Sequence, residues 1–260
     1  MNIFVFVKRV PDTESRIKID HGRNAVDEQG LNFVLSPYDE YALEEALRLR
    51  EAKTGKVTVF SLGSEETPVI LRKCLAMGAD EAVLIKDTAG ETYDGLRTAR
   101  IIAAVLRGPY PQFDLLLFGK QSVGADNAQV PSMVAELLGL PQANVVTKLE
   151  LGSDKGTAVR EVEGGEEKLA FSLPAVVSAQ KGLNEPRYET LKGIMAAKKR
   201  EIPVVAVDSL GLKPEELVSG VEVTGLETPP ARKAGRIVSG SPQDAARELA
   251  SLLRKEAKVI

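Results

Sequence analysis

Five short apolar runs in the first 180 residues constrain the fold more than any other feature of the chain. They read NIFVFV, KVTVFS, EAVLIK, FDLLLF and PAVVSA. Consecutive apolar positions over this length are typical of strands buried on both faces, as in a parallel sheet. Amphipathic helical patterns lie between the first four runs, at 39–52, 67–80 and 94–108. Strands that alternate with helices predict an α/β fold built on a parallel sheet with right-handed crossovers.

The pattern changes after Pro141. Between about 144 and 173, apolar and polar residues alternate around the turn sequences SDKG and EGGEE, which predicts an antiparallel extension of the sheet. From 203 to 260, proline and glycine are frequent, and an amphipathic helix with Ser241 as its expected N-cap closes the chain. A disordered tail rarely finishes in a capped helix. We therefore interpret 203–260 as an arm that packs on another subunit, appended to a domain of residues 1–202.

Composition and apolar run length indicate which partners, disulfides and membrane segments the chain can have. Lys and Arg total 34 against 37 Asp and Glu, and the net charge of −3 predicts no nucleic-acid partner. A single cysteine, Cys74, allows no intramolecular disulfide and fits a reducing compartment. The apolar start is too short for a signal peptide, and no run approaches the roughly 20 residues that span a bilayer. We expect a soluble protein of the cytoplasmic type with no direct membrane insertion.

Groups that could break bonds are scarce. The only histidine, His21, is expected in a solvated turn, and Cys74 is expected in the core. One histidine and one cysteine supply neither a Cys/His metal site nor a Ser-His-Asp set. Adjacent acids such as Glu44 and Glu45 would point apart on a helix, and we interpret them as solvated surface. The sequence therefore predicts no catalytic residue and no metal site.

The loop after the fourth apolar run is the first candidate binding site. Open α/β sheets bind ligands at the carboxyl ends of their strands, and this loop reads FGKQSVGADNAQV. Gly119 and Gly124 allow the backbone to approach a ligand closely, while Asp126 or Asn127 could cap the following helix. Free N–H groups at a helix start favour a phosphate. A capped loop that binds nothing would have the same composition, so the residues leave both interpretations open.

The second candidate is the segment LNEPRYETLKGIMAAKKREI, from 183 to 202. It predicts a polar turn fixed by proline and a helix that begins near Tyr188. An apolar surface next to the basic run Lys198, Lys199 and Arg200 would suit the docking of a partner protein. A solvated helix with a cationic C-terminal end would look the same, and composition alone slightly favours that interpretation.

Several of these segments together resemble the β-subunit of electron transfer flavoprotein. The resemblance is carried by KRVPD near the N-terminus, SPYDEYALEEALRL, CLAMGADEAVLI, LLLFGKQSVGADNAQ and, above all, LNEPRYETLKGIMAAKK. It extends from Met1 to about Ile202, with a looser match over the C-terminal arm. The long pattern that starts with LNEPRY is its most specific part.

The resemblance implies a Rossmann-like, adenine-nucleotide-binding domain of the adenine nucleotide alpha hydrolase-like type. It also implies an electron carrier, not an enzyme: a heterodimer with a larger α-subunit, a FAD shared by the two subunits, and an AMP of structural role in this subunit. Acyl-CoA and related dehydrogenases, as in fatty acid beta-oxidation, would reduce the FAD, and a quinone-linked oxidoreductase would reoxidise it. The expected location is the bacterial cytoplasm, or the mitochondrial matrix in a eukaryote.

The resemblance also assigns binding residues by position. Those that match the AMP contacts of the family are Phe6, Ser36, Pro37, Tyr38, Asp39, Leu62, Gly119, Lys120, Gln121, Ser122, Val123, Gly124, Ala125, Asp126, Asn127, Ala128, Gln129 and Val130. Tyr38 and Thr13 match positions near the flavin, although some members have tyrosine where this chain has Thr13. The family often has asparagine at the position of Ser36 and a more acidic loop around Gly124.

The recognition loop and helix of the family fall at about 183–200. Leu191 matches the leucine that anchors this loop in a pocket of acyl-CoA dehydrogenases, and this match reverses the interpretation from composition. We expect six residues to dock the partner: Leu191, Ile194, Met195, Lys198, Lys199 and Arg200.

Two alternatives stay open. In electron-bifurcating members of the family a second FAD replaces the AMP, and the loop from Gly124 to Asn127 does not distinguish the two ligands, although TLKGIMAAKK resembles the dehydrogenase-docking type. The other alternative is a stand-alone adenine-nucleotide-binding protein on the same sheet, against which the arm and the LNEPRY segment argue.

Overall fold

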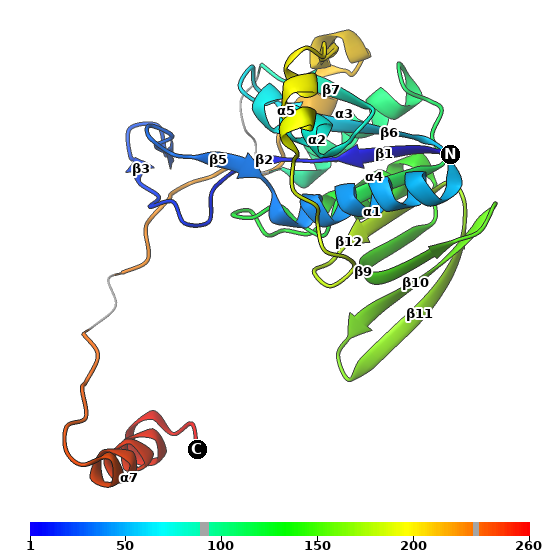
Figure 1. Ribbon diagram of the computed structural model, residues 1–260. Helices are drawn as coiled ribbons and strands as arrows, with labels where there is room; N and C mark the ends of the chain where they lie inside the picture. Colours follow the sequence, from blue (N-terminus) through cyan, green and yellow to red (C-terminus); the bar gives the residue numbers. More distant parts are fainter. Residues whose placement is uncertain (89–93, 231–233) are drawn as a thin grey trace. The chain divides into compact units, whose positions relative to one another are not determined.

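The computed structural model describes residues 1–88, 94–230 and 234–260. Contacts along the chain divide it into two units, Met1–Leu226 and Glu227–Ile260. The first unit is a nine-stranded sheet with helices on both faces (Figure 1). None of the helices within these ranges is both long and apolar enough to cross a membrane.

The predicted apolar runs form the parallel centre of the sheet, which confirms the predicted fold class. In chain order they are β1 (Asn2–Phe6), β6 (Lys56–Gly63), β7 (Glu81–Lys86), β8 (Leu115–Gly119) and β12 (Ala175–Ala179). In the sheet they lie in the order β12-β8-β1-β6-β7, and all neighbours are parallel. The chain builds outward from β1 through β6 and β7, then returns to the other side of β1 with β8. Sheets of this kind bind ligands where the strand order reverses, here between β1 and β8.

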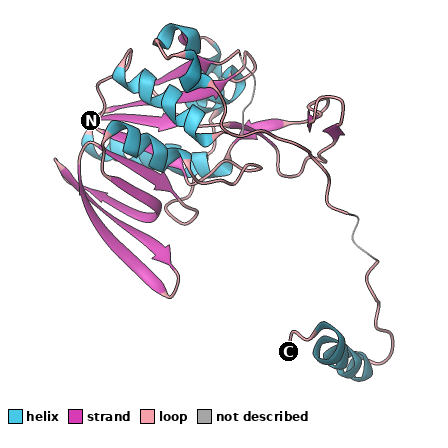
Figure 2. Cartoon of the chain, turned by 180° about the vertical axis from the view of Figure 1, so that it is seen from behind, coloured by secondary structure: helices cyan, strands magenta, loops and turns pink. Residues whose placement is uncertain are grey.

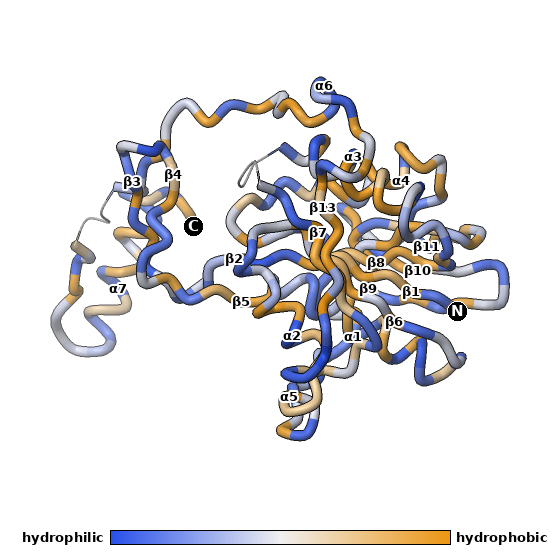
Figure 3. Tube along the Cα trace, turned by 90° about the horizontal axis from the view of Figure 1, so that it is seen from above, coloured by the Kyte–Doolittle hydropathy of each residue, from blue (hydrophilic) through white to orange (hydrophobic). Residues whose placement is uncertain are grey.

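Four helices bury the two faces of this centre (Figure 2): α1 (Pro37–Lys53) and α2 (Pro68–Met77) on one face, and α3 (Gly95–Arg107) and α4 (Val130–Leu138) on the other. Side chains of β1 alternate between the faces, as the period of a strand requires. Ile3 and Val5 pack with α1 and α2, whereas Phe4 and Phe6 pack with α3 and α4. Figure 3 shows the resulting apolar centre of the sheet, with hydrophilic loops at its ends.

The antiparallel extension predicted after Pro141 is present. It consists of β9 (Gln142–Leu151), β10 (Lys155–Val162) and β11 (Gly165–Ser172), paired antiparallel in that order. β9 itself runs parallel to β12 and so joins the extension to the main sheet. Two small ladders complete the N-terminal region: β2 (Arg9–Pro11) with β5 (Phe33–Leu35), and β3 (Ile19–Asp20) with β4 (Ala25–Val26). His21 lies exposed in the turn of the second ladder, as predicted.

The predicted arm is divided between the two units. β13 (Val204–Ala206) pairs with β7, a 3-10 turn (Val207–Leu210) follows, and α6 (Pro214–Leu217) packs beside α3. Residues 203–226 join the first unit because their apolar side chains, such as the buried Val207, pack against the α3 face of the core. The second unit holds α7 (Pro242–Leu252) and a π-helical turn (Leu253–Ala257). Ser241 caps α7 as predicted, with its hydroxyl accepting a hydrogen bond of 3.2 Å from the N–H of Asp244.

The adjacent acids of α1 correct one interpretation of the sequence. Glu44 and Glu45 are 3% and 8% exposed, not solvated. They are buried because residues far along the chain, Arg187 and Asn184, cover them and donate hydrogen bonds to their carboxylates. Cys74, in contrast, lies in the core as predicted, where burial raises the pKa of its thiol.

Candidate functional site

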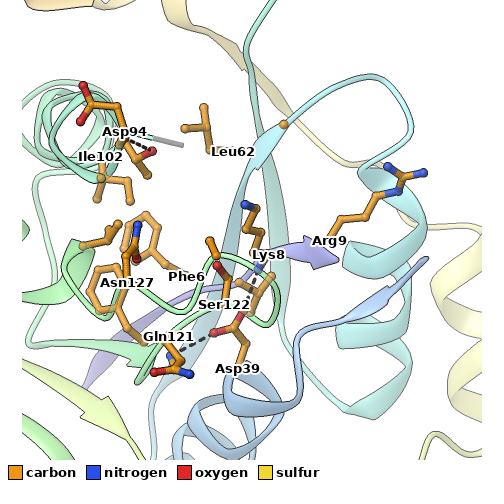
Figure 4. Close-up of a pocket in the computed structure, with 18 of the residues that line it drawn as sticks. Phe6, Lys8, Arg9, Asp39, Leu62, Asp94, Ile102, Gln121, Ser122 and Asn127 are labelled. Atoms are coloured by element: carbon orange, nitrogen blue, oxygen red, sulfur yellow. Dashed lines mark hydrogen bonds between the residues drawn. The ribbon is translucent and has the colours of Figure 1, made fainter. Parts of the chain in front are cut away.

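A cavity of about 660 Å³ lies at the carboxyl ends of β1, β6, β7 and β8, where the strand order reverses (Figure 4). Its walls come from the segments that follow these strands, from the first turn of α1, from residues 23–28 around β4 and from the start of α3. The volume falls within the range of small-molecule binding sites. The sheet therefore provides a ligand-sized hollow at the position that the loop sequence predicted.

The floor of the cavity is aromatic. The rings of Phe6 and Phe118, on neighbouring strands, stack with centroids 4.9 Å apart and an angle of 10° between their planes. Phe60 continues the row, with its centroid 5.1 Å from that of Phe6. Phe6 and Phe118 both line the cavity. The cavity therefore has an aromatic, apolar side against which a planar base could pack.

Asp39, in the first turn of α1, joins the two strands at the reversal point. One carboxylate oxygen accepts a hydrogen bond of 2.7 Å from the backbone N–H of Lys8, just after β1, and the other accepts one of 3.1 Å from Gly119, at the end of β8. Burial raises the pKa of Asp39 to about 7, and these two N–H donors oppose the rise. The side chain also lines the cavity.

Gly119 has no room for a side chain. A Cβ at this position would lie 2.3 Å from a carboxylate oxygen of Asp39 and 2.7 Å from the carbonyl carbon of Tyr38. The glycine predicted to bring the backbone close to a ligand thus brings it close to the start of α1. The next residue, Lys120, is also fixed, because its backbone N–H donates to the carbonyl of Ala179 on β12.

The loop from Gly119 to Val130 holds itself in shape. The side-chain amide of Gln121 donates to a carboxylate oxygen of Asp126 at 2.7 Å, and the N–H of Asp126 donates to the carbonyl of Ser122. Gly124, Asp126 and Ala128 all have positive φ, of 98°, 49° and 49°. This backbone corrects the capping prediction: α4 begins at Val130 with Gln129 as N-cap, so neither Asp126 nor Asn127 caps it.

The start of α3 forms a wall that the sequence analysis missed. Asp94 caps this helix by accepting from the N–H groups of Leu96 and Arg97, at 2.8 and 3.2 Å, and it also accepts from Gly220 at 2.7 Å. Burial alone would raise the pKa of Asp94, but these donors lower it below its usual range. Arg97 pairs with Asp87 at 2.5 Å, and both side chains are at least nine-tenths buried. An aspartate just before a glycine and an apolar helical run is a recognisable N-cap signal, and it was the available clue.

The structure brings most of the predicted nucleotide-binding residues to this cavity. Those that line it are Phe6, Asp39, Leu62, Gly119, Lys120, Gln121, Ser122, Ala125, Asn127, Ala128, Gln129 and Val130. Six others do not line it: Ser36, Pro37, Tyr38, Val123, Gly124 and Asp126. Ser36 is fully buried beside Asp39, and its hydroxyl oxygen has no hydrogen-bond partner among the described residues. Tyr38 is half-buried with the amine of Lys120 5.8 Å from its ring, and Thr13 is exposed.

The predicted docking residues gather on and after α5 (Leu191–Lys198), which lies beside α2 (Figure 1). Leu191 is 78% exposed and Met195 54%. The basic residues Lys198, Lys199 and Arg200 are also exposed. Ile194 differs, because it is half-buried and packs against the core. The helix predicted to begin near Tyr188 begins at Leu191 instead, with Thr190 as its N-cap. Tyr188 is 93% exposed and was not among the predicted docking residues.

Comparison with known proteins gives one consistent result. A family model described as "Electron transfer flavoprotein domain" matches residues 24–210. "Electron transfer flavoprotein subunit beta" of Bacillus subtilis is 41% identical over 262 residues, with both chains covered in full. The protein of the same name from Mus musculus is 38% identical, with 90% of this chain and 91% of the relative covered. This chain belongs to the electron transfer flavoprotein β-subunit family.

Membership of the electron transfer flavoprotein β-subunit family confirms the resemblance and the expectation of an electron-carrier subunit. The central sheet, with its reversal between β1 and β8, agrees with the Rossmann-like domain that the family implies. Among the described residues, no three His, Cys, Asp or Glu side chains are grouped so that they could hold a metal ion.

We predict that Gly119→Ala lowers the free energy of unfolding by at least about 2 kcal/mol, because the added methyl would overlap the Asp39 carboxylate and the backbone of α1. Gly165→Ala is the control: a Cβ there meets nothing within 4 Å, and its effect should stay within about 0.5 kcal/mol. Urea unfolding followed by circular dichroism measures both. Equal effects of the two substitutions would show that the contact at Gly119 is not tight.

The raised pKa of Asp39 gives a second prediction. The unfolded pKa is about 3.9 and the folded pKa about 7, so protonated Asp39 contributes stability that is fully present below pH 4 and is lost as pH rises through 7. Asp39→Asn removes this titration. Relative to the variant, the wild type should therefore lose on the order of a few kcal/mol between pH 4 and pH 8. Other groups titrate in both proteins and cancel in the difference. A difference in unfolding free energy that is independent of pH would contradict the prediction.

Proposed function

We propose that this chain is the β-subunit of a heterodimeric electron transfer flavoprotein. A FAD shared with a larger α-subunit takes electrons from acyl-CoA and related dehydrogenases, and a quinone-linked oxidoreductase reoxidises it. The observation that carries the proposal is the convergence on one cavity of most residues that the family resemblance assigns to a nucleotide. In a bacterium the complex works in the cytoplasm, and in a eukaryote it works in the mitochondrial matrix.

AMP is the proposed occupant of the cavity, and the residues present fit it. Phe6 and Phe118 offer an aromatic, apolar floor against which the base would pack. Around this floor, Ser122, Asn127 and Gln129 provide polar side chains, and Lys120 provides a cation for a phosphate. AMP would serve as a structural group that fills the cavity and satisfies these groups.

The flavin supplies the redox chemistry when it is bound, and this chain contributes part of its environment. Tyr38 and Thr13 are the proposed contributors. Both lie outside the cavity, Tyr38 half-buried at the start of α1 and Thr13 exposed beyond β2. They are therefore free to face a flavin that the α-subunit holds, while the cavity itself holds the AMP.

Leu191 is the proposed anchor for the dehydrogenase, with Met195 beside it and the basic run Lys198, Lys199 and Arg200 at the end of the same helix. A leucine that is 78% exposed gains free energy when a partner's pocket removes it from water. The nearby cations would steer an acidic partner toward the surface. Ile194 supports this surface indirectly, because its half-buried side chain packs α5 against the core.

A nucleotide count tests the proposal. The chain is co-produced with the α-subunit, the purified complex is denatured, and FAD and AMP are quantified by chromatography. We expect one FAD and one AMP per heterodimer, and less AMP with unchanged FAD in Gly119→Ala, because the loop is displaced. Two FAD and no AMP would instead identify an electron-bifurcating protein. A chain that is monodisperse and binds ATP without any partner would support the stand-alone alternative.

Leu191→Ala should raise the KM for the complex in reduction by an acyl-CoA dehydrogenase about tenfold, the effect of about 1.4 kcal/mol of lost apolar contact. FAD content should not change, because Leu191 lies on a surface helix. Val204→Ala, at a valine that is 57% exposed on the edge strand β13, is the matched control and should leave KM unchanged. An unchanged KM in Leu191→Ala would remove Leu191 from the docking surface.

A further inference from the structure

The buried acid Glu44 of α1 is bound by a residue 143 positions away. One of its carboxylate oxygens accepts from the side-chain Nε of Arg187 at 2.8 Å and from the backbone N–H of Arg187 at 3.1 Å. The other oxygen accepts from Nη2 of Arg187 at 3.1 Å and from Nε of Arg48 at 2.9 Å. The side chain of Glu44 is 3% exposed, so these donors replace nearly all of its contact with water.

Arg187 also binds a second carboxylate of the same helix. Glu51, two turns beyond Glu44, accepts from Nη1 of Arg187 at 2.6 Å and from Nη2 at 3.2 Å. The guanidinium group is therefore clamped between two carboxylates on one face of α1. Its planar fork makes several directed hydrogen bonds at once, which the single ammonium group of a lysine cannot reproduce.

Asn184 fixes the start of the docking segment, which we define as residues 184–200. Its side-chain amide donates to a carboxylate oxygen of Glu45 and to the carbonyl of Tyr41, both at 3.0 Å. Residues 184–190 form no helix or strand of their own. Their conformation is thus held by hydrogen bonds to α1 and by the fixed φ of Pro186.

The other end of the segment is attached to α2. Nη1 of Arg72 donates to the carbonyl of Ala197, in the last turn of α5, at 2.8 Å and to that of Arg200, just after the helix, at 3.2 Å. At the first turn, Thr190 accepts from the N–H of Gly193 at 3.0 Å. A Cβ on Gly193 would lie 2.2 Å from the carbonyl oxygen of Ala76, so the two helices are in close contact there.

Between these two attachments lie the most exposed apolar side chains of the segment, Tyr188 and Leu191, at 93% and 78%. Exposed apolar side chains make few contacts of their own, so the order of such a surface depends on how the flanking residues are attached to the core. Here the supports are an ion-pair cluster built on the buried Glu44 at one end and the packing of α5 on α2 at the other. Neither support involves the side chains of Tyr188 or Leu191.

We propose that Arg187, clamped by Glu44 and Glu51, is a positioning residue that orders the docking segment before any dehydrogenase binds. The inference rests on the proposed function, since it concerns the segment that presents Leu191. A segment ordered in advance loses little conformational entropy on binding. If only a fraction of the molecules held the competent conformation, the apparent affinity would fall by that fraction.

The test uses the complete heterodimer and three variants. Arg187→Lys keeps the positive charge but loses the planar guanidinium group that bonds both carboxylates. Glu51→Gln removes the charge of the more exposed carboxylate and leaves Glu44 in place. Lys148→Gln removes an exposed ion pair of 2.9 Å on β9 and is the control. Three quantities are measured for each: amide hydrogen exchange of peptides from 183 to 200, the FAD content, and kcat and KM for the complex in reduction by a purified acyl-CoA dehydrogenase.

For Arg187→Lys we expect amide exchange in 188–198 to speed up about tenfold and KM to rise about tenfold, with kcat and FAD content unchanged. Glu51→Gln should show the same changes at about two- to threefold, and Lys148→Gln should show none. Unchanged exchange in Arg187→Lys would overturn the inference, and so would faster exchange with an unchanged KM. A wild-type complex that accepts no electrons from the dehydrogenase would instead overturn the proposed function, while the exchange data would still decide whether Arg187 orders the segment.

Discussion

The carboxylate of Asp39 is the interaction on which the rest of the first unit depends. It accepts the backbone N–H groups that follow β1 and end β8, so one side chain of α1 connects the two strands between which the sheet order reverses. This connection brings α1 so close that Gly119 must lack a side chain. The loop that follows Gly119 is thereby directed over the aromatic floor, and the cavity takes its shape from these constraints.

Helix α1 supports both candidate functional regions. Its first turn shapes the cavity through Asp39, and its later turns hold the docking segment through Glu44, Glu45 and Glu51. Carboxylates serve at each point because they accept several directed donors at once, and all of them except the exposed Glu51 are buried. Each carboxylate is costly to bury alone, so removing one of its partners should disturb local structure more than removing an apolar contact would.

The parts of this structure that depend on local pattern were predictable from the sequence, and the parts that depend on distant pairing were not. The consecutive apolar residues of β1 or β8 identify buried strands by themselves. Glu44 and Glu45 resemble solvated residues of an amphipathic helix, because the Arg187 and Asn184 that cover them lie about 140 positions away. Asp39 gives no local sign that it bridges two strands. The start of α4 at Val130 likewise follows from the positive φ values of the loop, which the residue types Asp126 and Ala128 do not specify.

The most direct test of the central claim is an experimental structure of the co-purified heterodimer, with attention to the cavity at the carboxyl ends of β1 and β8. We predict density for an adenine nucleotide between the loop from Gly119 to Val130 and the start of α3, over Phe6 and Phe118. A cavity filled only by ordered water, with the loop in the same conformation, would contradict the claim that this edge of the sheet is built to hold a nucleotide.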